Sequence, residues 1–151
     1  MRRRAIVLML AFSALLLPRG AAPQNAPAQK AFDEAAASRL VMQLSEGLEA
    51  HIQKQFLGAF DLDKMKEGAV FRQQINSFFI HTESFRVHLN LAQVAAQGEQ
   101  ATMVVDAELE GQPSNGQPAW RRNQQLNFVV AATAGRWKFV EVQPRTFFSL
   151  P

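Results

Sequence analysis

The sequence predicts an α+β fold in which N-terminal helices pack in the concave face of a curved four-stranded antiparallel sheet, a cone. Up to about residue 82, apolar residues recur every three or four positions, which is the spacing of an amphipathic helix. After Ser84 the apolar period becomes two, and turn-forming residues separate four such stretches, as in strands with one buried face. Helices followed by consecutive antiparallel strands indicate that the sheet wraps around the helices.

The first residues lie outside this domain. Met1 is followed by three arginines and then by an apolar run from Ala5 to Leu17, which are the charged and apolar regions of an export signal. A membrane-spanning helix needs about 20 apolar residues, so the length favours a signal over an anchor. We assign residues 1–28 to the signal peptide and the start of a flexible tail, with candidate cleavage regions at residues 20–22 and 26–28.

Removal of the signal changes the net charge from +3 to about −1. The chain of 151 residues has 16 Lys and Arg against 13 Asp and Glu, but four of the arginines lie before Ala28. The remaining basic residues are scattered, which argues against a nucleic-acid partner. The chain has no cysteine, which excludes disulfides, a thiol nucleophile and a lipid-modified cysteine. We therefore expect an exported protein, periplasmic or secreted, with no membrane anchor after signal removal.

The helical region is expected to begin with one long amphipathic helix over residues 31–60. Its apolar stripe has mostly four-residue spacing: Phe32, Leu40, Leu44, Leu48, Ile52 and Phe56. The "FDLDK" stretch breaks this pattern, and Asp61 or Asp63 can cap a second, shorter helix. A further helix is expected over about residues 70–82, where four apolar residues share one face: Phe71, Ile75, Phe78 and Phe79.

The first two strands are expected to bury their odd-numbered residues. Because paired strands keep their buried faces together, this parity predicts an odd-length loop around residues 97–99. The same register places Arg86 opposite Glu110 and His88 opposite Glu108 on the outer face, where opposite charges stabilise strand pairing.

The last two strands are expected to follow the turn-rich "GQPSNGQP" stretch and to be joined by a tight turn at Ala134–Gly135. Even-numbered residues face inward on the third strand, and the tight turn carries this face to Trp137, Phe139 and Glu141. The register puts Glu141 opposite Phe128, among apolar side chains. The domain is expected to cover residues 31–145, with residues 146–151 as a C-terminal tail.

This order of elements resembles the nuclear-transport-factor-2-like superfamily, also called SnoaL-like or cystatin-like cone proteins. The resemblance covers about residues 31–143 and rests on the long first helix, the aromatic-rich "RQQINSFFIHTESFRVHLNL", the "QGEQATMVV" hairpin and the closing "GRWKFVEVQP". It implies a cone fold and a homodimer that pairs through the sheet face. The superfamily includes isomerases, cyclases, dehydratases, transport factors and interaction modules, so the fold alone selects no function.

The candidate site consists of residues expected on the inner faces of the last two strands: Trp120, Arg122, Gln124, Phe128, Trp137, Phe139 and Glu141. Glu141 is the candidate catalytic acid or base, because an apolar pocket raises the pKa of a carboxyl group. Its alternative role is structural, as a hydrated group or the partner of Arg122. The chain has no tyrosine, so the carboxylate and phenol pair of ketosteroid-isomerase-like enzymes cannot be carried over.

Two functions stay open. The first is an exported binding or protein-interaction module that has an apolar cone pocket for a small ligand, or a surface for a protein, and no catalytic motif. The alternative is a small lyase or isomerase of the SnoaL or ketosteroid-isomerase-like type that uses Glu141. The histidines lie on different elements without ligand spacing, so neither a metal nor another cofactor is predicted. A filled cone would exclude both the enzyme and the small-ligand carrier and would leave protein interaction.

Overall fold

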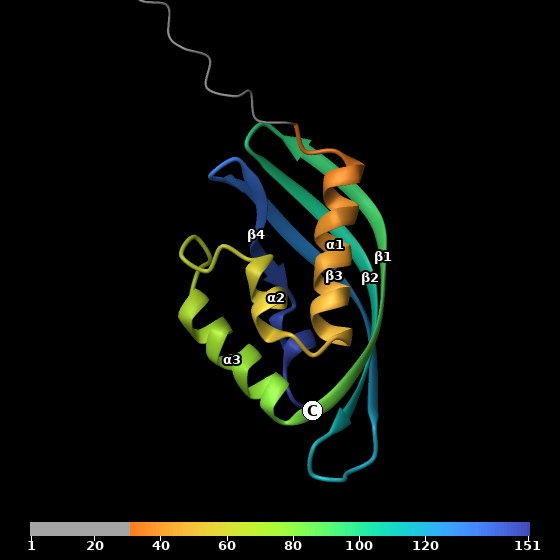
Figure 1. Cartoon of the computed structure of the whole chain (residues 1–151). Coiled ribbons are helices and arrows are strands. Elements are labelled where there is room, and N and C mark those ends of the chain that lie inside the picture. Colours follow the sequence, from red (N-terminus) through yellow and green to blue (C-terminus); the bar gives the residue numbers. More distant parts are fainter. Residues whose placement is uncertain (1–30) are drawn as a thin grey trace, which may run out of the picture.

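The computed structural model describes residues 31–151, so the predicted export signal lies outside the described residues. The elements are α1 (Glu34–Glu49), α2 (Gln53–Gly58), α3 (Gly68–Ile80), β1 (Thr82–Gln97), β2 (Gln100–Pro113), β3 (Trp120–Thr133), β4 (Arg136–Gln143) and the 3-10 helix η1 (Arg145–Phe148). The strands form one antiparallel sheet in the order β1-β2-β3-β4. The sheet curves around α1, and α2 and α3 lie on the same side of it (Figure 1). The predicted fold class is confirmed.

The predicted long first helix is two helices. α1 begins after Asp33, whose carboxylate accepts a hydrogen bond from the Ala36 N–H at 2.7 Å, and the chain turns after Glu49. Ile52, expected on the buried stripe, is exposed. Gly47 explains the break, because a Cβ there would lie 2.7 Å from the Phe56 backbone nitrogen. α2 therefore folds back against bare backbone of α1, and Phe56 remains buried although it belongs to another helix.

The expected short helix after Asp61 or Asp63 is also absent, since residues 62–67 form turns and a bend. α3 begins at Gly68, where a Cβ would lie 1.9 Å from the carbonyl oxygen of Leu62. Only a glycine fits this contact. The connection between α2 and α3 is therefore folded tightly on itself rather than helical.

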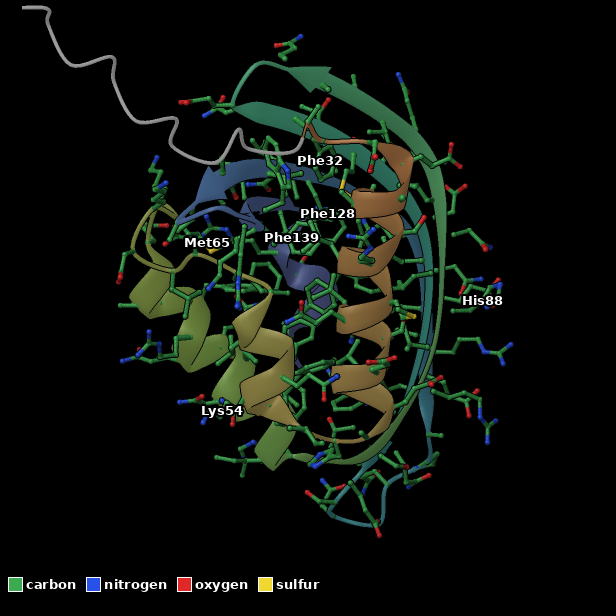
Figure 2. All side chains as sticks on the ribbon, turned by 45° about the horizontal axis from the view of Figure 1, so that its top comes forward. Phe32, Lys54, Met65, His88, Phe128 and Phe139 are labelled. Carbon is green, nitrogen blue, oxygen red and sulfur yellow. The ribbon has the colours of Figure 1, made fainter. Side chains whose placement is uncertain are left out.

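The pairing predicted for β1 and β2 is confirmed, with Arg86 opposite Glu110. The odd-length loop is wrong, because the turn has two residues, Gly98 and Glu99, between the strands. A β-bulge at Ala92 supplies the extra residue that parity requires. His88 lies on the outer face, as predicted, and points away from the core (Figure 2).

The register predicted for β3 and β4 holds only near their turn. Pairing follows the prediction as far as Phe139, but a β-bulge at Val140 shifts the pairs beyond it. Phe128 is consequently opposite Val142, which is buried, and not opposite Glu141. One extra residue inverts the faces of all the residues that follow. The prediction that Glu141 faces the cone interior is therefore wrong.

Apolar side chains fill the centre of the cone. Phe128 and Phe139 lie there, with ring centroids 4.5 Å apart (Figure 2). The sequence predicts a tail over residues 146–151, but η1 buries Phe147 and Phe148. Phe148 meets Phe56 of α2 with ring centroids 5.2 Å apart. The C-terminal turn is therefore part of the core and not a tail.

Polar side chains from β3 and α3 hold η1 in this place. Arg122 Nη1 lies 2.9 Å from three carbonyl oxygens, those of Thr146, Phe147 and Ser149. The Gln74 side chain donates to two more, those of Arg145 and Phe148, at 2.7 and 3.0 Å. Carbonyl groups at a helix end lack partners within the helix, and each costs about 1–3 kcal/mol when it is buried unpaired. Arg122 and Gln74 remove that cost.

We predict that Phe148→Ala lowers the free energy of unfolding by about 3–5 kcal/mol, because it removes a fully buried ring. Leu150→Ala is the control, since Leu150 is 39% exposed and its loss should cost no more than about 0.5 kcal/mol. Urea unfolding of the two variants measures both values. Equal, small losses would contradict the placement of η1 in the core.

Candidate functional site

The structure does not gather the predicted site residues into one pocket. Phe128 and Phe139 are core residues, and Gln124 is exposed on β3. Trp137 packs against Phe32 at the start of α1, with ring centroids 4.9 Å apart. These side chains contribute to the core, to the surface and to one end of the cone, respectively.

Trp120 and Arg122 lie at the opposite end of β3 from the β3–β4 turn, next to the C-terminal turn. The Arg122 guanidinium carbon is 4.3 Å from the centroid of the Trp120 ring. A Cβ at Gly111 would lie 2.2 Å from a Trp120 ring atom, so the indole covers bare backbone of β2. Burial lowers the pKa of the Arg122 guanidinium from its ordinary value. Both residues have structural contacts that account for their position.

Glu141 is the partner of Arg145 and not of Arg122. Arg145 Nε and Nη2 donate to its Oε1 at 3.1 and 2.9 Å, and Arg145 Nη2 also donates to the Lys66 carbonyl oxygen at 2.7 Å. The two side chains are 26% and 18% exposed. The pair joins β4 and η1 to the segment before α3. The predicted use of this carboxylate as an acid or base gains no support from this geometry.

A cleft of about 630 Å³ between α2, α3 and the β3–β4 end is the candidate site in the structure. This volume lies within the range of small-molecule sites. Its apolar lining comes from Leu57, Phe60 and Leu62, and Phe60 is buried. Lys54 extends from α2 in the region where α2 and α3 lie side by side (Figure 2).

The cleft forms because the chain after α2 runs along the edge of β4. The Ala59 carbonyl oxygen accepts from the Phe139 N–H at 2.9 Å, and the Asp61 N–H donates to the Phe139 carbonyl oxygen at 2.8 Å. The segment thus adds a short parallel bridge to the sheet edge. It then turns away to α3, and the cleft lies between this turn and the two helices.

Asp61 fastens this segment to the end of β3. Its Oδ2 accepts a hydrogen bond from Thr133 Oγ1 at 2.7 Å, and Lys64 Nζ donates to Thr133 Oγ1 at 3.1 Å. The Thr133 hydrogen bond holds the pKa of Asp61 below its ordinary value of 3.8, although burial opposes the effect. Asp61 is therefore an anchored anion, the opposite of a carboxyl group with the raised pKa of a general acid.

Three cations of the cleft are available to a ligand. Lys54, Arg72 and Lys138 line it, and the side chain of none of them has a hydrogen bond or ion pair within residues 31–151. Lys138 is half-buried, whereas the other two are exposed. The second carboxylate of the cleft, Asp63, is exposed. Sequence reasoning missed this group because its members come from separate elements without a shared motif.

No group of three or more His, Cys, Asp or Glu within residues 31–151 could hold a metal ion. In the same part of the chain, no helix is long and apolar enough to cross a membrane.

Solved structures share this arrangement of helices and sheet. A candidate aromatic ring hydroxylase from Novosphingobium aromaticivorans matches with a TM-score of 0.62 at 20% identity, over 72% of this chain and 84% of its own. A nuclear-transport-factor-2-like superfamily protein from Salmonella enterica matches with a TM-score of 0.61 at 10% identity, over 72% and 86%. The chain has the nuclear-transport-factor-2-like fold.

Another structure with the nuclear-transport-factor-2-like fold is a candidate scytalone dehydratase from Novosphingobium aromaticivorans. It matches with a TM-score of 0.62 at 13% identity, over 72% of this chain and 79% of its own. No protein-family model and no curated protein matches the chain. At these identities the likeness concerns the nuclear-transport-factor-2-like fold, which serves many unrelated functions.

We predict that Asp61→Asn makes stability less dependent on pH under acid conditions. Because the folded state lowers the pKa of Asp61, its stabilisation is present above the unfolded pKa of about 4 and is lost as pH falls through the folded value. At pH 7 the free energy of unfolding of the variant should be about 1–2 kcal/mol lower than that of the wild type. As the pH falls, it should decrease less than that of the wild type. Urea unfolding from about pH 6 to pH 2 measures this.

The matched control is Asp63→Asn, because the Asp63 side chain is exposed and has no partner in the described chain. It should keep the acid dependence of the wild type. An equal flattening by both substitutions would show that the Thr133 hydrogen bond does not cause the effect.

Proposed function

We propose that this chain is an exported binding module whose ligand site is the cleft between α2 and α3 and not the cone interior. The filled cone carries the proposal: Met103, Phe128 and Phe139 at its centre are at most 1% exposed. Phe147 and Phe148 of η1 are equally buried. A ligand inside the cone would have to displace such side chains, and removal of one buried phenylalanine already costs about 3–5 kcal/mol.

A small lyase or isomerase is the alternative, since one similar structure is a candidate dehydratase. Two observations favour binding over this chemistry. Glu141 is held by Arg145 at 2.9 Å. Asp61, the least exposed carboxylate of the cleft, has a lowered pKa, which makes it a weak base near neutral pH.

Export belongs to the proposal and rests on the arginine-rich start and the short apolar run of the sequence. We predict that protein recovered from outside the cytoplasm lacks the first 22–28 residues, which intact-mass spectrometry measures. Leu10→Arg interrupts the apolar run and should leave the chain uncut in the cytoplasm. An exported chain that keeps Met1 would contradict the proposal.

The binding function is tested by a thermal-shift screen of chemically diverse small molecules against the exported chain. A ligand at 100 times its dissociation constant stabilises the folded state by about 2.7 kcal/mol. We expect the amide resonances of hits to shift at residues 53–63, 72–76 and 133–138, which contain the cleft lining. Shifts centred on Met103 and Phe128 would place the ligand in the cone and contradict the proposed site. Chemical conversion of a hit would favour the enzyme.

A further inference from the structure

We infer that the ligand of this cleft is a small organic anion, a carboxylate carried by an apolar body. This inference rests on the proposed function and adds the chemistry of the ligand. The cleft combines two features that such a molecule matches: three cations without partners in the described chain and an apolar lining. Each feature constrains a different part of the ligand.

The cations favour an anionic group. Lys54 comes from α2, Arg72 from α3 and Lys138 from β4, so they approach the cleft from three elements. The half-buried Lys138 has lost part of its hydration without gaining a carboxylate among residues 31–151. A ligand carboxylate would supply the missing charge partner, and guanidinium and ammonium groups both donate to carboxylates.

The carboxylates of the cleft do not reverse this preference. Asp61 already accepts from Thr133, and Lys64 Nζ lies 4.0 Å from its Oδ2. Asp63 is exposed, as Lys54 and Arg72 are, so solvent and salt screen these charges alike. The charge of Asp61 is compensated, which leaves one unpaired carboxylate against three unpaired cations in the cleft lining.

The apolar lining favours an organic body over a bare inorganic anion. Leu57 and Leu62 are half-buried and lie beside the buried Phe60. An inorganic anion would leave this surface in water, whereas an apolar body would bury it, at about 25 cal/mol per Å². Phosphate alone should therefore bind more weakly than a carboxylate of suitable size.

A polar contact holds the walls of the cleft together. The Gln53 side-chain amide donates to the Asn76 side-chain oxygen, which joins α2 to α3. Lys54 follows Gln53 in the chain, and Arg72 lies one helical turn before Asn76. Lys54 and Arg72 thus extend from two helices that are joined to each other. This reduces the entropic cost of holding the two helices around a ligand.

The test uses naphthalene-2-carboxylate as the probe and calorimetric titration of the exported chain. Naphthalene-2-methanol has the same rings without the charge, and inorganic phosphate has charge without the rings. We expect the carboxylate to bind at least about tenfold more tightly than either one. Equal affinity for the alcohol, equal affinity for phosphate, or no binding of the carboxylate would overturn the inference.

Two cleft variants and one control locate the effect. Arg72→Gln and Lys138→Gln should each weaken binding of the carboxylate about tenfold and leave binding of the alcohol unchanged. Lys66→Gln removes the same charge from an exposed site outside the cleft lining and should change neither affinity. Thermal unfolding of each variant shows that the fold is intact.

The outcomes separate this inference from the proposed function. If Lys66→Gln weakens binding of the carboxylate as much as the two cleft variants do, the proposed anion site is overturned. If the screen finds only neutral or cationic ligands whose signals shift in the cleft, the binding module stands and the anion inference falls. Turnover of the probe into a new product would overturn both, since the site would then belong to an enzyme.

Discussion

The inward-facing guanidinium of Arg122 is the constraint on which the rest of the structure depends. An arginine near an apolar core needs acceptors, because an unpaired buried charge costs several kcal/mol. In this chain the acceptors are carbonyl oxygens of the C-terminal turn, three of them 2.9 Å from Nη1. The same contact brings Phe147 and Phe148 into the core. Burying those rings fills the space between α3 and β3, so a candidate ligand site must be sought outside the cone.

Much of the fold could be predicted from the sequence, because periodicity reports which face of an element is buried. The parity of the apolar residues in β1 and β2 correctly predicts Arg86 opposite Glu110. Parity cannot report bulges, since one extra residue leaves each half of a strand with its own regular alternation. The bulge at Val140 therefore turned a correct pattern into a wrong position for Glu141. In the helices, Ile52 continues a four-residue spacing through a point where the chain turns.

The candidate site was much less accessible to sequence reasoning. A predicted site on the inner face of the sheet assumes that the cone contains an empty space. Whether it does depends on the C-terminal segment, whose "TFFSL" residues show neither the period of a strand nor that of a long helix. The cleft depends on Phe60 and Asp61 joining the edge of β4. Such a long-range contact has no local signature. The interrupted pattern at "FDLDK" was the available signal, and it indicates a break without telling where the chain goes.

The chain segments around the cleft are fixed to the sheet by contacts that need no ligand. His51 has a positive φ of 54°, and its Nε2 lies 2.7 Å from the Thr82 carbonyl oxygen, so this nitrogen must carry the proton. The bond fixes the turn between α1 and α2 to the start of β1. At the other end of α2, Asp61 and Thr133 join the α2–α3 connection to β3. A site whose walls are already fastened to the sheet at two places loses little conformational freedom on binding. Its affinity should then depend on charge, which the cleft variants change, and on the apolar match, which the choice of probe changes.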